Sequence, residues 1–414
     1  EDYCLRHEIP FPHFNRLAGR PIKPSPMYER LKEKGAVFEE VYGHERPRWF
    51  ARGNVAQEDQ YSFRRNDVHD IVGTECKAVR ETVGIMDISA FTKVKISGLD
   101  AAVNLDRLVA NKLPQKVGGI ALTHVMNRLG RIELETTVVK LADDAFYLVC
   151  AAFFEQRLLD HLKFNQNGEA VEVTKLSDDW AALTLNGPNS RKVLEQCTDA
   201  PLDNANFRWL SAQKIMVAGH DVWAFRMSYS GELGWEFHIP RENALAVYDA
   251  LWAAGEAHGI EDYGSFTMNT LRMEKAFKGA GELNNEVTLP EADVMRFAKL
   301  DKEYIGVEQT RASAQQAEDG TMSWICAYLE FESDGVEDGH GGEAIVVDGQ
   351  IVGSTASVAY SHTYGKILAF AYIKPHAAVP DTEITVIVAG KPRKGRILAD
   401  AVYDPENRKP RTDA

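Results

Sequence analysis

Cysteine is scarce in this chain of 414 residues, and its spacing excludes the commonest cysteine-based sites. The five cysteines lie far apart, at Cys4, Cys76, Cys150, Cys197 and Cys326. No pair has the C-x-x-C spacing of a zinc or redox site, so we expect no metal. Free thiols are typical of a reducing compartment, which here would be the bacterial cytoplasm or the mitochondrial matrix.

Long apolar runs and an excess of positive charge are also absent. No segment approaches the ~20 apolar residues of a membrane span. The first residues lack the basic and apolar regions of a secretory signal. The net charge of -14 repels nucleic acid and anionic membranes, so neither is an expected partner. Because the chain begins with Glu1 rather than methionine, we expect that it was processed or begins inside a longer gene product.

No G-x-G-x-x-G turn follows a predicted strand, so the chain has no visible dinucleotide site of its own. The length of the chain and its pattern of predicted helices and strands indicate an α+β protein of two or three domains. Residues 1–57 form an irregular tail, and 58–306 alternate helices and strands in a body of two subdomains. Residues 307–321 predict a linker or an exposed helix. The short β-runs of 322–414 are typical of a small barrel or sandwich.

A predicted strand near residue 132 carries two carboxylates. Side chains alternate along a strand, so Glu133 and Glu135 share one face while Leu134 points to the other. One interpretation is therefore a pair of carboxylates on one exposed face. The alternative is a solvated acidic face without chemistry.

A predicted hairpin carries a second candidate group. Tyr229 ends one strand, and Trp235 and Glu236 begin the next after a glycine-rich turn. A carboxylate that accepts two N–H groups suits the edge of a 2-amino-4-oxo pyrimidine, and aromatic faces can hold its plane. Simple core packing is the alternative for the aromatic residues. Arg272 lies on a later helix whose charges, taken alone, indicate only an exposed surface.

Taken in order, these pieces resemble one family. The chain is similar to the glycine-cleavage aminomethyltransferase (T-protein) family, in the branch fused to dimethylglycine and sarcosine dehydrogenases. The resemblance rests on five motifs in the family's order, namely VGIMDIS at 83–89, LNGPNS at 185–190, YSGELGWE at 229–236, LDKEYIG at 300–306 and YDPEN at 403–407.

The resemblance implies a T-protein-like body that binds tetrahydrofolate, followed by a C-terminal β domain. Glu135 matches the family's acidic residue beside the folate reaction centre. Tyr229 and Glu236 match its pterin contacts, and Trp235 lies at the family's aromatic position beside Glu236. Arg272 matches a retained arginine, for which a structural role in the helix is at least as well supported as a folate role.

Three positions depart from the T-protein pattern. Leu134 replaces the first of two aspartates, which leaves one carboxylate. Met268 and Asn269 replace an Arg-Asp pair, which argues against a lipoyl-protein partner. Leu122 replaces a tyrosine and leaves His124 nearby as a candidate participant.

The tail at 1–57 resembles the end of a flavin-bearing oxidoreductase half, so FAD is expected only in an upstream domain or a partner chain. The implied activity is one-carbon transfer from an N-methyl amine to tetrahydrofolate, giving 5,10-methylenetetrahydrofolate, with Glu135 as base. A stand-alone folate-dependent demethylase and a non-catalytic folate-binding scaffold remain as alternatives. A relative that acts in iron–sulfur assembly fits poorly, because residues 281–286 contain no cysteine. The sequence is compatible with an oligomer.

Overall fold

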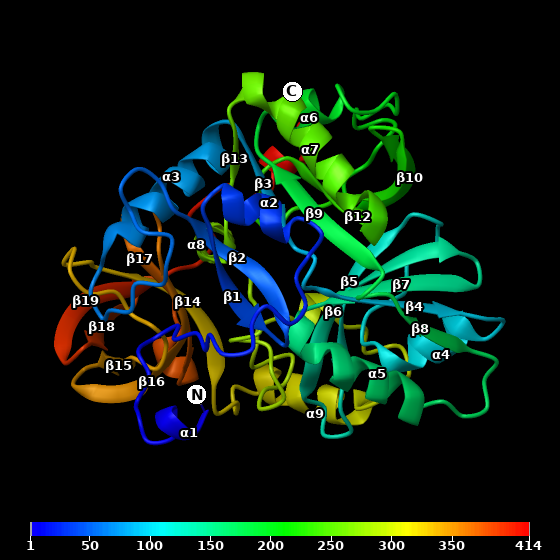
Figure 1. Cartoon of the computed structure of the whole chain (residues 1–414). Helices are drawn as coiled ribbons and strands as arrows, with labels where there is room; N and C mark the ends of the chain where they lie inside the picture. Colours follow the sequence, from blue (N-terminus) through cyan, green and yellow to red (C-terminus); the bar gives the residue numbers. More distant parts are fainter. Residues whose placement is uncertain (1, 414) are drawn as a thin grey trace.

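The structure, a computed structural model, describes residues 2–413 and has three bodies arranged around a common centre (Figure 1). Two are sheets covered by helices, and the third is a β-barrel. The T-protein-like mixed fold expected from the sequence is confirmed, and the C-terminal domain is a closed barrel rather than a sandwich. Among the described residues, no helix is both long and apolar enough to cross a membrane.

The first body is a six-stranded sheet. Its strands, in spatial order, are β10 (Ser211–Val217), β11 (His220–Arg226), β12 (Gly234–Pro240), β9 (Trp180–Asn186), β3 (Val83–Asp87) and β13 (Ile260–Asp262). One face is covered by α6 (Ser190–Leu194) and α7 (Ala244–Gly255), which bury an apolar core with β9 and β12. At the β3 end lie α3 (Asp67–Glu81) and α8 (Ser265–Glu274). Asn66 caps the N-terminus of helix α3, because its side chain accepts a hydrogen bond from Val68 N.

The second body is inserted between β3 and β9 of the first. Its antiparallel sheet contains, in spatial order, β5 (Ile120–Met126), β6 (Ile132–Ala142), β7 (Ala145–Cys150), β4 (Thr92–Ser97) and β8 (Glu172–Lys175). Helices α4 (Ala101–Leu108) and α5 (Glu155–Phe164) pack on one face. The other face packs against the first sheet through an apolar cluster, which includes Val139, Tyr147 and Phe225. The two sheets therefore face one another.

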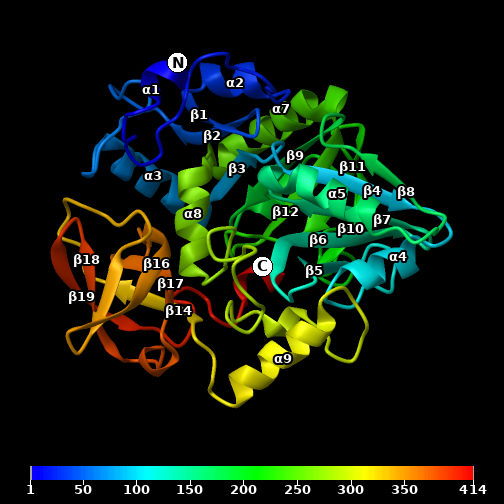
Figure 2. The same cartoon turned by 90° about the horizontal axis from the view of Figure 1, so that it is seen from below.

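The third body is the barrel, closed in the order β14 (Ile325–Phe331), β17 (Ile367–Ile373), β16 (Gln350–Tyr360), β15 (Ala344–Val347), β18 (Glu383–Val388) and β19 (Lys391–Ile397). Helix α9 (Val307–Glu318) precedes it, so the segment expected as a linker or exposed helix contains a helix. Figure 2 shows α8 between the barrel and the first sheet. Met273 of α8 packs with Tyr328, Leu368 and Phe370 of the barrel, which fixes this contact.

The N-terminal segment runs across the first body. It contains α1 (Asp2–Leu5), α2 (Tyr28–Glu33) and a hairpin of β1 (Ala36–Val41) and β2 (His44–Phe50). Met27, Leu31 and Phe50 are buried in the same core as the first sheet. Residues 27–50 are therefore an integral part of this body in the structure.

Candidate functional site

Glu135 lies on β6, on the face that looks toward the first sheet. Leu134 is buried in the core on the opposite face, as the alternation of side chains predicts. Across the hairpin Glu135 is paired with His124 of β5, and the atoms His124 Nε2 and Glu135 Oε2 are 3.4 Å apart. The Glu135 side chain is 28% exposed and so remains open to a ligand. Its neighbour Glu133 is held by Asn127 and Arg157 instead.

Glu236 lies on the facing surface of the first sheet. In the register of β11 with β12 it is opposite Phe225, which belongs to the apolar cluster between the sheets. His238 shares this face, because it is two residues further along β12. The Nδ1 atom of His238 is 3.0 Å from the hydroxyl of Tyr147 on the second sheet. The structure therefore places Glu135 and Glu236 on the two surfaces that face one another.

Trp235 does not join these carboxylates. Its side chain has no exposed surface and lies in the core on the far face of β12, with its ring 6.2 Å from that of Phe207. The expectation that indole and carboxylate lie together fails for a simple reason. Consecutive residues of a strand point to opposite faces, so Trp235 and Glu236 cannot contact one ligand from the same side.

Tyr229 lies in the loop after β11, which ends at Arg226 rather than at the tyrosine. The phenol donates a hydrogen bond to Lys278 O at 2.8 Å, and the ring stacks on Phe277 at 5.9 Å. Burial raises the pKa of Tyr229, which Arg272 lowers and Glu135 raises further. Tyr229 is thus a protonated phenol within electrostatic reach of both Glu135 and Arg272.

Arg272 holds the loop that receives Tyr229. Its guanidinium donates to Asn269 Oδ1, Phe277 O and Glu282 Oε2, each at 3.0 Å, and the side chain is buried. The same oxygen of Glu282 accepts a hydrogen bond from Gly279 N at 2.7 Å. These contacts support the structural interpretation of Arg272, and its folate role stays a prediction.

Glu232, in the turn between Tyr229 and Glu236, is also structural. Its carboxylate pairs with Arg80 of α3 at 2.9 Å. Arg80 pairs as well with Glu274 of α8 at 2.6 Å, and its guanidinium lies 3.8 Å from the centre of the Tyr403 ring. The Gly-Glu-x-Gly part of the hairpin motif is therefore an anchor for the turn.

Sequence reasoning missed three buried residues of this region, namely Tyr147, His238 and Glu282. For His238 a signal was available, because the period of two along Glu236–Phe237–His238 places the histidine beside the carboxylate. Tyr147 and Glu282 gave no local signal, since their partners come from other parts of the chain. Within residues 2–413, no group of three His, Cys, Asp or Glu side chains is arranged to hold a metal.

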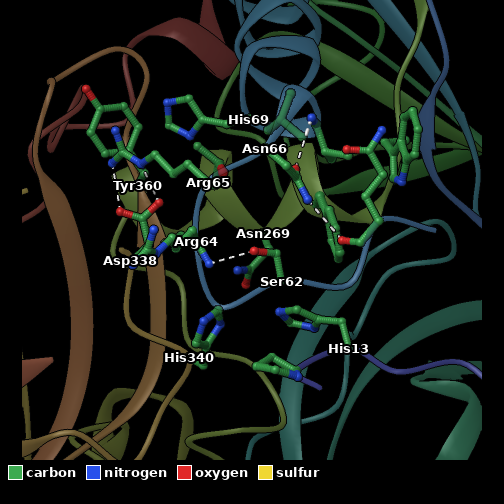
Figure 3. Close-up of a pocket in the computed structure, with 18 of the residues that line it drawn as sticks. His13, Ser62, Arg64, Arg65, Asn66, His69, Asn269, Asp338, His340 and Tyr360 are labelled. Atoms are coloured by element: carbon green, nitrogen blue, oxygen red, sulfur yellow. Dashed lines mark hydrogen bonds and ion pairs between the residues drawn. The ribbon is translucent and has the colours of Figure 1, made fainter. Parts of the chain in front are cut away.

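A separate cavity of about 230 Å³ lies where the N-terminal segment, α8 and the barrel meet (Figure 3). His13 and His340 point into it from one side, and Arg65 lies on the other side, paired with Asp338 at 2.7 Å. Asn269 lines this cavity and accepts the hydrogen bond from Arg272. Asn269 of α8 thus links this cavity to Arg272, which holds the loop that receives Tyr229.

Comparisons with known proteins agree with this architecture. The family of the GCVT N-terminal domain matches residues 27–302, and the family of the glycine cleavage T-protein C-terminal barrel domain matches residues 326–404. Human mitochondrial dimethylglycine dehydrogenase is 35% identical over 399 residues, which cover 94% of this chain and 45% of that protein. Mouse mitochondrial sarcosine dehydrogenase is 28% identical over 456 residues, which cover 99% and 49%. The chain thus spans about half the length of these relatives.

Among solved structures, glycine cleavage system aminomethyltransferase T from Bartonella henselae matches with a TM-score of 0.80 at 20% identity, covering 93% of this chain and 99% of that one. Two facing sheets beside a closed barrel are thus the fold that this chain shares with that aminomethyltransferase. The chain belongs to the glycine cleavage T-protein family, in agreement with the resemblance in its motifs.

Proposed function

We propose that the chain is the tetrahydrofolate-dependent one-carbon transfer part of an N-methyl amine dehydrogenase. The observation that carries this proposal is the placement of Glu135 and Glu236 on facing sheets, with the phenol of Tyr229 within electrostatic reach of Glu135. The relation to dimethylglycine and sarcosine dehydrogenases supports the class of donor.

The two carboxylates suit a ligand with several N–H groups. Among residues 2–413, neither Glu135 nor Glu236 accepts a hydrogen bond, and their nearest cationic or imidazole neighbours are His124 Nε2 at 3.4 Å and His238 Nε2 at 3.9 Å. Both side chains are partly exposed, at 28% and 16%. Their oxygens are therefore free to accept from a pterin edge or from folate nitrogens.

When bound, tetrahydrofolate would supply the nitrogen nucleophiles that take up the carbon as 5,10-methylenetetrahydrofolate. Glu236 would orient the pterin by accepting its N–H groups, and Tyr229 would bound its plane. Glu135 would accept the proton released at the folate nitrogen and stabilise positive charge near it. General-base assistance of this kind contributes about 10²–10⁴-fold to the rate.

We further propose that FAD is held by an upstream domain or by a partner chain. The relatives are about twice as long as this chain, which leaves length for such a domain. Exposed apolar side chains also lie in the N-terminal segment, where a partner would cover them, as at Ile9, Ile22 and Tyr42. The mitochondrial relatives and the free thiols support a mitochondrial matrix or bacterial cytoplasmic location.

Calorimetric titration with tetrahydrofolate tests the binding part of the proposal. We expect micromolar affinity in the wild type and a loss of at least about tenfold in Glu236→Ala, because it removes one contact worth about 1.4 kcal/mol. Tyr229→Phe should also lose about tenfold, because the ring is no longer held by its hydrogen bond to Lys278 O. Glu133→Gln should bind as the wild type does, and it is also the matched control for Glu135→Gln, since Glu133 shares the strand and face of Glu135 but is paired with Arg157. A folded wild type without affinity for tetrahydrofolate would refute the proposal.

The catalytic part is tested with the chain together with its flavoprotein. We expect Glu135→Gln to bind tetrahydrofolate normally and to form 5,10-methylenetetrahydrofolate about 10²–10⁴-fold more slowly. Unchanged turnover in Glu135→Gln would leave the chain as a folate-binding scaffold. Activity without any flavoprotein would favour a stand-alone demethylase.

A further inference from the structure

Each of the two candidate carboxylates has a buried imidazole behind it. Glu135 is opposite His124 across the β5–β6 hairpin, and Glu236 is two residues before His238 on β12. Neither histidine side chain has more than 1% of its surface exposed. The His124–Glu135 pair lies across a hairpin of the second sheet, whereas the His238–Glu236 pair lies along one strand of the first sheet. Because no shared local geometry explains both pairs, we attribute them to the site that the two sheets form.

His124 lacks the partners that a buried imidazole normally has. Neither ring nitrogen makes a hydrogen bond within the described residues. The polar neighbour of Nε2 is Glu135 Oε2 at 3.4 Å, and the ring of Phe297 lies 6.0 Å away. Buried polar groups are almost always paired, so an unpaired imidazole beside a partly exposed carboxylate needs an explanation, and a role toward that carboxylate supplies one.

His238 has one fixed partner, and this partner sets its tautomer. Its Nδ1 atom is 3.0 Å from the hydroxyl of Tyr147, while Nε2 has no hydrogen bond in the described part of the chain. Burial raises the pKa of Tyr147 well above its usual value, so the phenol keeps its proton and can donate it to Nδ1. In a neutral imidazole the remaining proton then lies on Nε2, which faces Glu236 Oε2 at 3.9 Å.

We propose that His124 and His238 are positioning residues that present an Nε2–H group to Glu135 and to Glu236, respectively. Neither pair makes a hydrogen bond as the side chains stand, so each imidazole would close onto one carboxylate oxygen when a ligand engages the other. Burial lowers the pKa of His238, so it acts as a neutral donor rather than as a cation. The inference rests on the proposed function, because it assigns His124 to the reacting group and His238 to the binding group.

Nitrogen NMR of the ligand-free chain labelled with ¹⁵N-histidine tests the geometry without any activity. We expect both residues to show the Nε2–H tautomer, with signals assigned through His124→Gln and His238→Gln. Glu135→Gln should shift only the His124 signal and Glu236→Gln only the His238 signal, whereas Tyr147→Phe should convert His238 into a mixture of tautomers. An Nδ1–H tautomer at either residue, or signals unaffected by these changes, would overturn the assignment.

Binding and turnover in the assembled enzyme then separate the two roles. His124→Phe should lower turnover about tenfold with tetrahydrofolate affinity unchanged, and His238→Phe should lower affinity about tenfold. His124→Gln and His238→Gln should restore most of each loss, because glutamine still offers an N–H donor. His220→Gln, at the start of β11, is the control and should change neither quantity.

The outcomes distinguish this inference from the proposed function. Wild-type protein that binds no tetrahydrofolate contradicts the proposed function, while the NMR result still decides the tautomers. Wild-type binding with equal losses in the phenylalanine and glutamine variants overturns the positioning role alone.

Discussion

Replacement of Arg80 by methionine should loosen the turn that carries the candidate site. The guanidinium joins three parts of the fold, because it pairs with Glu232 of the turn at 2.9 Å and with Glu274 of α8 at 2.6 Å, and it stacks on Tyr403 of the C-terminal tail. It also donates to Ser230 O at 2.8 Å. Methionine keeps much of the apolar volume and removes all of these donors.

The loss of stability in Arg80→Met depends on the hydrogen bonds that Glu274 and Glu232 would keep. Glu274 is fully buried and would keep the hydrogen bonds from Ser361 and Thr363, so its carboxylate is partly compensated. Among residues 2–413, Glu232 would keep the hydroxyl of Tyr403 as its one side-chain donor. Burial already raises the pKa of Glu232, and Arg80 is its main compensating charge. Removing one partner of a buried pair costs about 3–5 kcal/mol, and we expect Arg80→Met to fall in this range.

Urea unfolding, followed by circular dichroism and tryptophan fluorescence, measures this loss. Arg311→Met is the matched control, because Arg311 also pairs with two glutamates, Glu303 and Glu308, but on the surface. Exposed pairs contribute about 0–1 kcal/mol, so the control should remain close to wild type. The two probes must agree, since a protein of three bodies need not unfold in one step.

A double-mutant cycle that combines Arg80→Met with Glu232→Gln tests whether this ion pair holds the turn. If the pair acts as described, the two changes together should cost less than the sum of the single changes, by about 1–3 kcal/mol. Additive losses, or an Arg80→Met loss no larger than that of Arg311→Met, would show that the turn is held by other contacts. We also expect Arg80→Met to weaken tetrahydrofolate binding, because the same turn positions Tyr229.

Three further predictions concern single residues. Trp235→Phe should lower the free energy of unfolding in urea by about 1–3 kcal/mol, since the indole lies wholly in the core. Calorimetry should show unchanged tetrahydrofolate affinity, and a large loss of affinity would contradict that placement. Burial lowers the pKa of Lys93 from 10.5 to about 7, so the folded state holds fewer protons than the unfolded state between these values. The free energy of unfolding should therefore rise with pH from about 7 toward 10.5. Urea midpoints measured at pH 7 and 9 should rise in the wild type and rise less in Lys93→Met. An equal rise in both proteins would refute the prediction. Gly279→Ala would place a methyl group 3.2 Å from the Tyr229 hydroxyl and should weaken tetrahydrofolate about tenfold, as a calorimetric titration would detect; unchanged affinity would mean that the loop adapts.

Local geometry made part of this fold and site predictable. The alternation of side chains placed Glu133 and Glu135 on one face of β6 and Leu134 in the core. Motif order led to the family and to its expected site residues. For the C-terminal domain, however, short β-runs allowed a barrel or a sandwich. The pairing of β14 with β19, which are separated by about sixty residues, closes the barrel and decides between them.

The sequence by itself determined the family, the β domain that follows the α/β body, and the placement of Glu133 and Glu135 opposite Leu134, because these depend on residue order and on the period of the strand. Only the tertiary structure decided that Glu135 and Glu236 look toward one another, that Glu232 serves Arg80, and that Trp235 belongs to the core. Those relations depend on how separate elements pack, and Arg80 and Glu232 lie 152 positions apart in the chain. Contacts between residues so far apart in the sequence depend on how buried and charged surfaces pack together, and a local pattern of residues does not predict that packing.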